Sequence, residues 1–154
     1  LWLMPSLVSL ASMGEDVTLE SANKALQEQH WSEAITQFEK LREDKSLTEE
    51  GVQFVSDRLI HAYYRRGIEH FHHGRVEEAI KDFDREIELD PSRDPHHWQR
   101  GLAYYYAGEF QKGVDQFTRH RTVNPDDVEN AVWHFLCAVK APGGSIESAR
   151  KNLI

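Results

Sequence analysis

The sequence of 154 residues contains one cysteine, five prolines, no long hydrophobic run and fewer basic than acidic residues. The single cysteine, Cys137, excludes a small domain held together by disulfide bonds. The composition also excludes a collagen-like chain and a polytopic membrane protein. Eighteen basic against 26 acidic residues give a net charge of −8, which would repel the phosphate backbone of nucleic acids on average. We therefore expect one soluble domain without a nucleic acid partner.

The N-terminal residues 1–13, LWLMPSLVSLASM, are nearly all apolar or small. The stretch is too short for a stable membrane span, which needs about 20 apolar residues. An apolar run followed by small residues is typical of the later part of a secretory signal, although no basic residue precedes Lys24. We expect residues 1–14 to be a signal-peptide remnant, or else an apolar arm that packs on the first helices. The protein is accordingly expected to be exported or periplasmic, with a cytoplasmic location as the alternative.

The sequence repeats with a period of 34 residues when 61–94 is aligned with 95–128. The identical pairs include Arg66/Arg100, Gly67/Gly101, Gly74/Gly108, Phe83/Phe117 and Pro91/Pro125. Each unit predicts two helices, because apolar residues recur every three or four positions within it. In the first unit, a helix over about 62–72 ends near Gly74, and a second helix ends before Pro91. A glycine inside the first helix, Gly67, predicts a close approach between helices.

These units resemble the tetratricopeptide repeat (TPR). The residues that carry the resemblance are Tyr63, Arg66, Gly67, Phe71, Gly74, Ala79, Ile80, Asp82, Phe83 and 89–91, and the second unit repeats them from Arg100 to Pro125. The second unit departs at Gly113, where alanine is usual, and at His97, where an aromatic residue is usual. The resemblance implies an all-α fold, in which antiparallel helix pairs stack into a right-handed superhelix with a concave groove.

The resemblance extends over 17–154. A weak repeat, 17–45, precedes the strong repeats 61–94 and 95–128, and Gln29 stands in it where glycine is usual. Eleven extra residues before the first strong repeat predict a longer loop and an N-terminal helix extension starting near Thr48. A degenerate capping unit, 128–154, is expected to hold a helix over Val128–Lys140 and another capped by Ser145. The stretch 130–137 resembles that of bacterial exported TPR proteins.

The resemblance also places one set of residues on the concave face. They are Tyr64, Ile68, Phe71, His72, Trp98, Gln99, Leu102, Tyr105 and Tyr106. Aromatic side chains with polar ends suit a peptide-binding site, because they offer a large contact area with few rotatable bonds. The alternative is that these residues form core, with the helix over 128–140 folded across them. A chaperone-type carboxylate clamp is not expected, since only Asn23 and Arg65 among its positions could serve.

Two arginines of the repeats are expected to be structural. Arg66 should pair with Asp82 on the second helix of its own unit, whereas Arg100 faces Gln116 there and needs another acceptor, such as Asp115. The alternating acids, Asp82, Asp84, Glu86, Glu88 and Asp90, are spread around a helix and predict a solvated face rather than an acid–base pair.

Among nine histidines, His70, His72 and His73 surround Phe71, and a second group consists of His61 with the adjacent His96 or His97. The groups lie too far apart along a helix for one metal site, so no metal or other cofactor is expected. No nucleophile elbow, phosphate loop or metalloprotease helix is present. The sequence therefore predicts a non-catalytic scaffold or adaptor that binds an unknown protein or peptide partner. The alternatives are a histidine-based metal- or small-ligand-binding protein and a self-associating module, that is, a homo-oligomer.

Overall fold

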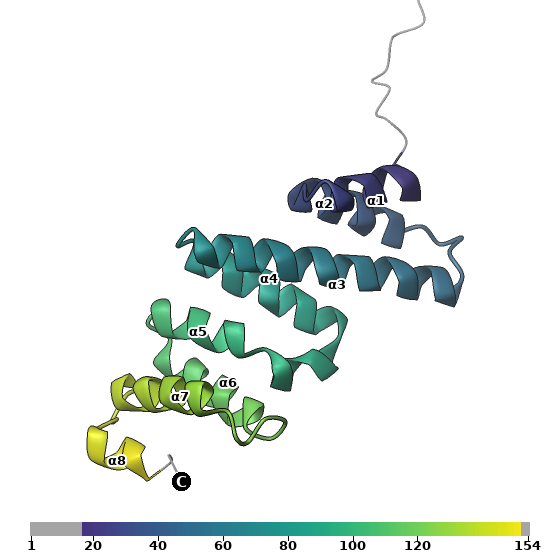
Figure 1. Cartoon of the computed structure of the whole chain (residues 1–154). Coiled ribbons are helices and arrows are strands. Elements are labelled where there is room, and N and C mark those ends of the chain that lie inside the picture. The colour runs from purple at the N-terminus through teal and green to yellow at the C-terminus, as the bar shows by residue number, and fades with distance from the viewer. Residues whose placement is uncertain (1–16, 152–154) are drawn as a thin grey trace, which may run out of the picture.

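A computed structural model describes residues 17–151 of the chain. Within this range there are eight α-helices, one 3-10 helix and no strand. The elements are α1 (Leu19–Gln27), α2 (Trp31–Arg42), α3 (Glu49–His72), α4 (Val76–Leu89), η1 (Pro91–His96), α5 (Trp98–Tyr106), α6 (Phe110–His120), α7 (Val128–Lys140) and α8 (Ile146–Arg150). Successive α-helices pack antiparallel and stack in chain order (Figure 1). The predicted all-α architecture of stacked helix pairs is confirmed.

The helix boundaries follow from a few residues with special backbone geometry. Gly74 and Gly108 close the turns after α3 and α5 with φ of 72° and 76°, values that L side chains rarely adopt. Gln29 takes the corresponding place after α1 with φ of 62°, so the weak repeat keeps the turn without the glycine. α4 ends at Leu89, two residues before Pro91, as the stop signal predicts.

The eleven extra residues mostly lengthen a helix. α3 has 24 residues and begins at Glu49, where the Thr48 hydroxyl caps it by accepting from the amide of Gly51 at 3.2 Å. Its first half packs against α1 and α2 in one core cluster that includes Phe38 and Leu59, both fully buried. Its second half joins α4 and α5 in a second cluster around Phe83. α3 is therefore shared by both parts of the core.

The glycines inside α3 and α5 allow a phenyl ring to lie on the helix backbone. A Cβ atom at Gly67 would lie 2.5 Å from Cε1 of Phe83, and one at Gly101 would lie 2.6 Å from Cζ of Phe117. Real Cβ atoms do not come so close, so no larger residue fits without displacing the ring. The close helix approach predicted from the repeated glycine is confirmed in both units.

The two repeat arginines have different partners. Arg66 donates from Nε and Nη2 to the carboxylate of Asp82 at 2.8 and 2.7 Å, as predicted. Arg100 does not bind Asp115, and that prediction is wrong. Its guanidinium is buried and donates to Gln116 on α6, to Asp84 on α4 and to Asp94 on η1. The 3-10 helix brings Asp94 to this position, and sequence periodicity gave no indication of it.

The structure describes the C-terminal helices α7 and α8 but not the first sixteen residues. The predicted signal remnant or arm, 1–14, lies outside the described residues. At the other end, α7 has the predicted bounds, and the Ser145 hydroxyl caps α8 by accepting from the amide of Ser148 at 3.0 Å. Between residues 17 and 151, no helix combines the length and the apolar character that crossing a membrane requires.

Candidate functional site

An apolar pocket of about 420 Å³ lies between α3 and α5. It is lined by Tyr64, Arg65, Ile68, Phe71, His72, Trp98, Gln99 and Leu102. Seven of these eight residues belong to the predicted groove set, and Arg65 is the addition. Spacings of three and four residues place them on one face of each helix, so two adjacent first helices form opposite walls. The pocket is open, since Trp98 keeps 37% of its surface exposed.

The other two predicted residues, Tyr105 and Tyr106, do not line this pocket. Their rings lie 5.2 and 6.0 Å from the ring of Trp133 on α7, and Tyr105 also contacts Phe110 at 5.7 Å. α7 therefore packs against the far end of the aromatic row and leaves the pocket between α3 and α5 uncovered. A ring contact between Phe71 and Tyr106, at 5.8 Å between centroids, joins the aromatic cluster to the pocket.

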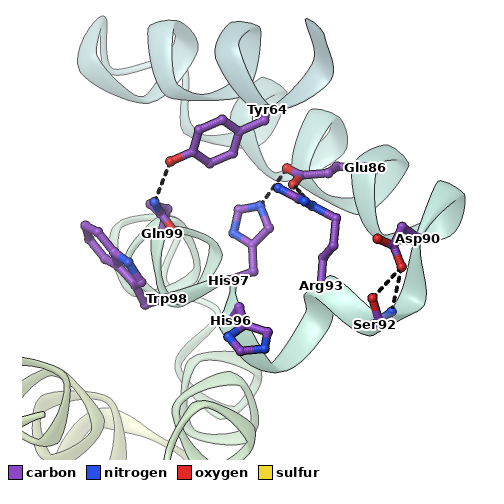
Figure 2. A pocket seen from close by; sticks show the side chains of 9 residues that line it. All are labelled: Tyr64, Glu86, Asp90, Ser92, Arg93, His96, His97, Trp98 and Gln99. Carbon is purple, nitrogen blue, oxygen red and sulfur yellow. Dashed lines mark hydrogen bonds and ion pairs between the residues drawn. The ribbon is translucent and has the colours of Figure 1, made fainter. Parts of the chain in front are cut away.

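A polar pocket of about 410 Å³ adjoins the apolar one and shares Tyr64, Trp98 and Gln99 with it (Figure 2). The Gln99 side-chain amide donates to the Tyr64 hydroxyl at 2.7 Å across the space between α3 and α5. This bond fixes two groove side chains before any partner arrives. The remaining lining residues come from the end of α4 and from η1, and include Glu86, Arg93 and His96.

At the base of the polar pocket a buried carboxylate binds two cationic or polar groups. Glu86 has 1% of its surface exposed, and it accepts from Nε of Arg93 at 2.5 Å and from Nε2 of His97 at 3.0 Å (Figure 2). The predicted solvated face is therefore wrong for Glu86, and also for Asp82, which is buried and paired with the half-buried Arg66. Both carboxylates lie on the inner side of α4, and each has a partner from a neighbouring element.

His97 links this carboxylate to the start of α5. Its Nδ1 accepts from the amide of Arg100 at 3.3 Å, so the hydrogen of the neutral ring is on Nε2 and points to Glu86. The ring also lies 4.5 Å from that of Phe83 and 6.0 Å from that of Tyr64. His97 thus does the packing of the aromatic residue usual at this position and caps α5 as well.

His70 and His120 each have a hydrogen-bond partner elsewhere in the protein. Nδ1 of His70 accepts from Arg75 at 2.8 Å, and Nδ1 of His120 lies 3.0 Å from the carbonyl oxygen of Pro95. Over residues 17–151, no three or more His, Cys, Asp or Glu side chains gather as a metal site would require.

Cys137 is fully buried on α7, next to Gly113 of α6. Burial raises the pKa of its thiol to about 12. At pH 8 only about one thiol in ten thousand would be ionised, so the folded protein should resist a thiol reagent such as a chromogenic disulfide. We expect labelling to be complete in urea and nearly absent in native buffer. Rapid labelling of the native protein would contradict this.

Comparison with known proteins identifies one part of the chain. A search of the curated proteins finds no match. Residues 60–93 match the family model described as tetratricopeptide repeat, in nearly the register that the 34-residue period predicts. The matched residues cover the second half of α3, all of α4 and the start of η1. This segment is therefore a tetratricopeptide repeat, a module that in general serves as a protein-interaction scaffold and is typically non-catalytic.

Proposed function

We propose that this protein is a non-catalytic adaptor that holds a peptide or helix of a partner protein in the groove between α3 and α5. One observation carries the proposal: the open apolar pocket is lined by seven of the nine residues that the sequence singled out for binding. Exposed apolar surface at a concave site is a common mark of an interaction surface.

The groove has the features that favour tight binding of a side chain. Trp98 offers a large apolar area, and tryptophan and tyrosine are over-represented among the residues that dominate binding energy. The hydrogen bond from Gln99 to Tyr64 holds two wall residues in place, which lowers the ordering cost of binding. Beneath them, the pairs of Glu86 with Arg93 and His97 hold η1 and the start of α5 against α4.

Trp98→Ala should weaken peptide binding by at least about thirtyfold, because truncating a central anchor of an interface typically costs about 2 kcal/mol or more. The measurement is fluorescence anisotropy with peptides selected from a displayed random library on the immobilised protein. Circular dichroism should show unchanged helical content, since Trp98 is partly exposed.

The matched control is Val132→Ala on α7, an exposed apolar residue that does not line the groove. It should leave the affinities unchanged. If Trp98→Ala unfolds the protein, the residue belongs to the core. If every selected peptide binds the Trp98→Ala variant as well as the wild type, the groove is not the binding site.

A further inference from the structure

One face of α3 carries a basic row that continues from the apolar pocket. Phe54, Arg58, His61, Arg65, Ile68 and His72 follow one another at alternating spacings of four and three residues. At 100° per residue these positions fall within one narrow sector of the helix. Arg65, Ile68 and His72 line the apolar pocket, so the whole row lies on the groove side of α3. Phe54 and Arg58 belong to the helix extension that precedes the repeat.

The two arginines of the row lie over aromatic rings. Arg58 lies over the ring of Phe54 at 4.8 Å, and Arg65 lies over the ring of Trp31 at 5.3 Å. In the part of the chain that the structure describes, neither forms an ion pair. Asp57, which precedes Arg58 in the sequence, accepts a hydrogen bond from the side-chain amide of Gln53 at 2.8 Å. In a chain with net charge −8, two exposed arginines therefore lie on the groove side of α3, where acidic groups of a partner could reach them.

The surroundings of His61 indicate the same positive field. Burial and the nearby charges of Arg65, Arg58 and Arg93 lower the pKa of His61, while the more weakly acting Glu86 raises it. Three arginines, two from α3 and one from η1, therefore lie near His61. The ion pair with Glu86 of α4 holds Arg93 in this position.

We propose that the occupant of the groove is an acidic peptide segment with one bulky apolar side chain. The apolar side chain enters the pocket between Ile68, Trp98 and Leu102, and carboxylates beside it in the segment bind Arg65 and Arg58. This deepens the proposed function and depends on it. The two arginines are seven residues apart, about 10 Å along the helix, which about three residues of an extended peptide span. The charges would determine which partner binds and how fast it associates.

The test is selection of a displayed random peptide library on the wild-type protein, followed by affinity measurements on synthetic versions of the enriched peptides. We expect enriched peptides to carry Asp or Glu within a few residues of an aromatic or aliphatic residue. Replacing their acids by Asn or Gln, or using the Arg58→Gln/Arg65→Gln variant, should lower affinity by about tenfold or more at low salt. Raising the salt to 1 M, where the screening length falls to about 3 Å, should remove most of this difference.

The control is Lys40→Gln/Lys81→Gln, which removes the same charge from exposed residues of α2 and α4 outside both pockets. It should leave affinity unchanged, and thermal melts should show that both double variants are folded. Two results would overturn the acidic-partner proposal and leave the proposed function standing. One is peptides whose binding depends on Trp98 but that lack acidic residues, and the other is peptides whose affinity the arginine substitutions leave unchanged. A library without any Trp98-dependent binder would overturn both.

Discussion

Gly67→Leu should lower the free energy of unfolding by more than about 3 kcal/mol, and this is the largest effect that we expect from a single substitution. The side chain would begin 2.5 Å from Cε1 and 2.7 Å from Cδ1 of Phe83, a fully buried ring at the centre of the second core cluster. The ring cannot move away, because Ala79, Ile80 and Ala103 belong to the same cluster. α3 and α4 would have to separate. Urea unfolding followed by circular dichroism measures the change.

Gly51→Ala is the matched control in the same helix. A Cβ atom there would meet only the end of the Leu47 side chain, at 3.3 Å, and the Thr48 hydroxyl, at 3.5 Å. Because alanine is favoured over glycine inside a helix by up to about 1 kcal/mol, this variant should be as stable as the wild type or slightly more so. A Gly67→Leu variant that unfolds at the wild-type urea concentration would show that α3 and α4 are not held together by the Gly67–Phe83 contact.

Glu86→Ala should lower the free energy of unfolding by about 2–4 kcal/mol. The substitution removes the acceptor for Nε2–H of His97, whose side chain is almost fully buried, and leaves that donor without a partner. The orientation of the ring would then no longer be fixed, and with it the cap that His97 gives to α5. Thermal and urea unfolding of the variant measure the loss.

Two neighbouring substitutions distinguish the effect of losing the buried carboxylate from the effect of losing a charge at the surface. Glu88→Ala removes an exposed acid of the same helix and should cost less than about 1 kcal/mol. Arg93→Ala should also cost little, because 43% of the Arg93 side chain is exposed and Glu86 keeps its bond to His97. Equal stability of the Glu86→Ala and Glu88→Ala variants would mean that the bond between Glu86 and His97 contributes nothing.

The elements that could be predicted from sequence depend on local signals. Glycine at the turns, proline after α4 and the three- and four-residue apolar spacing define the helices of 60–93 almost to the residue. The pair of Arg66 and Asp82 was also predictable, because both lie at fixed places in one hairpin. Seven of the residues that the resemblance placed on the concave face line the apolar pocket.

The features that escaped prediction depend on contacts between units. In the sequence Glu86 is one of several acids on a charged helix. In the structure η1 and the residue after it place Arg93 and His97 against its carboxylate. Arg100 has its acceptors on three different elements, which no spacing within one hairpin indicates. Tyr105 and Tyr106 lie against Trp133 of α7, which matches the alternative that the sequence left open for these two residues alone.

The length of α3 has a mechanical consequence. With 24 residues the helix is a rod of about 36 Å, and its two halves are embedded in different core clusters. Repeat arrays can usually fray from either end, since each unit touches only its neighbours. Here, detachment of the N-terminal pair α1 and α2 would expose the first half of α3, a helix whose second half remains packed in the next repeat. A displacement of α1 or α2 would therefore act on the same rigid helix that forms one wall of the groove.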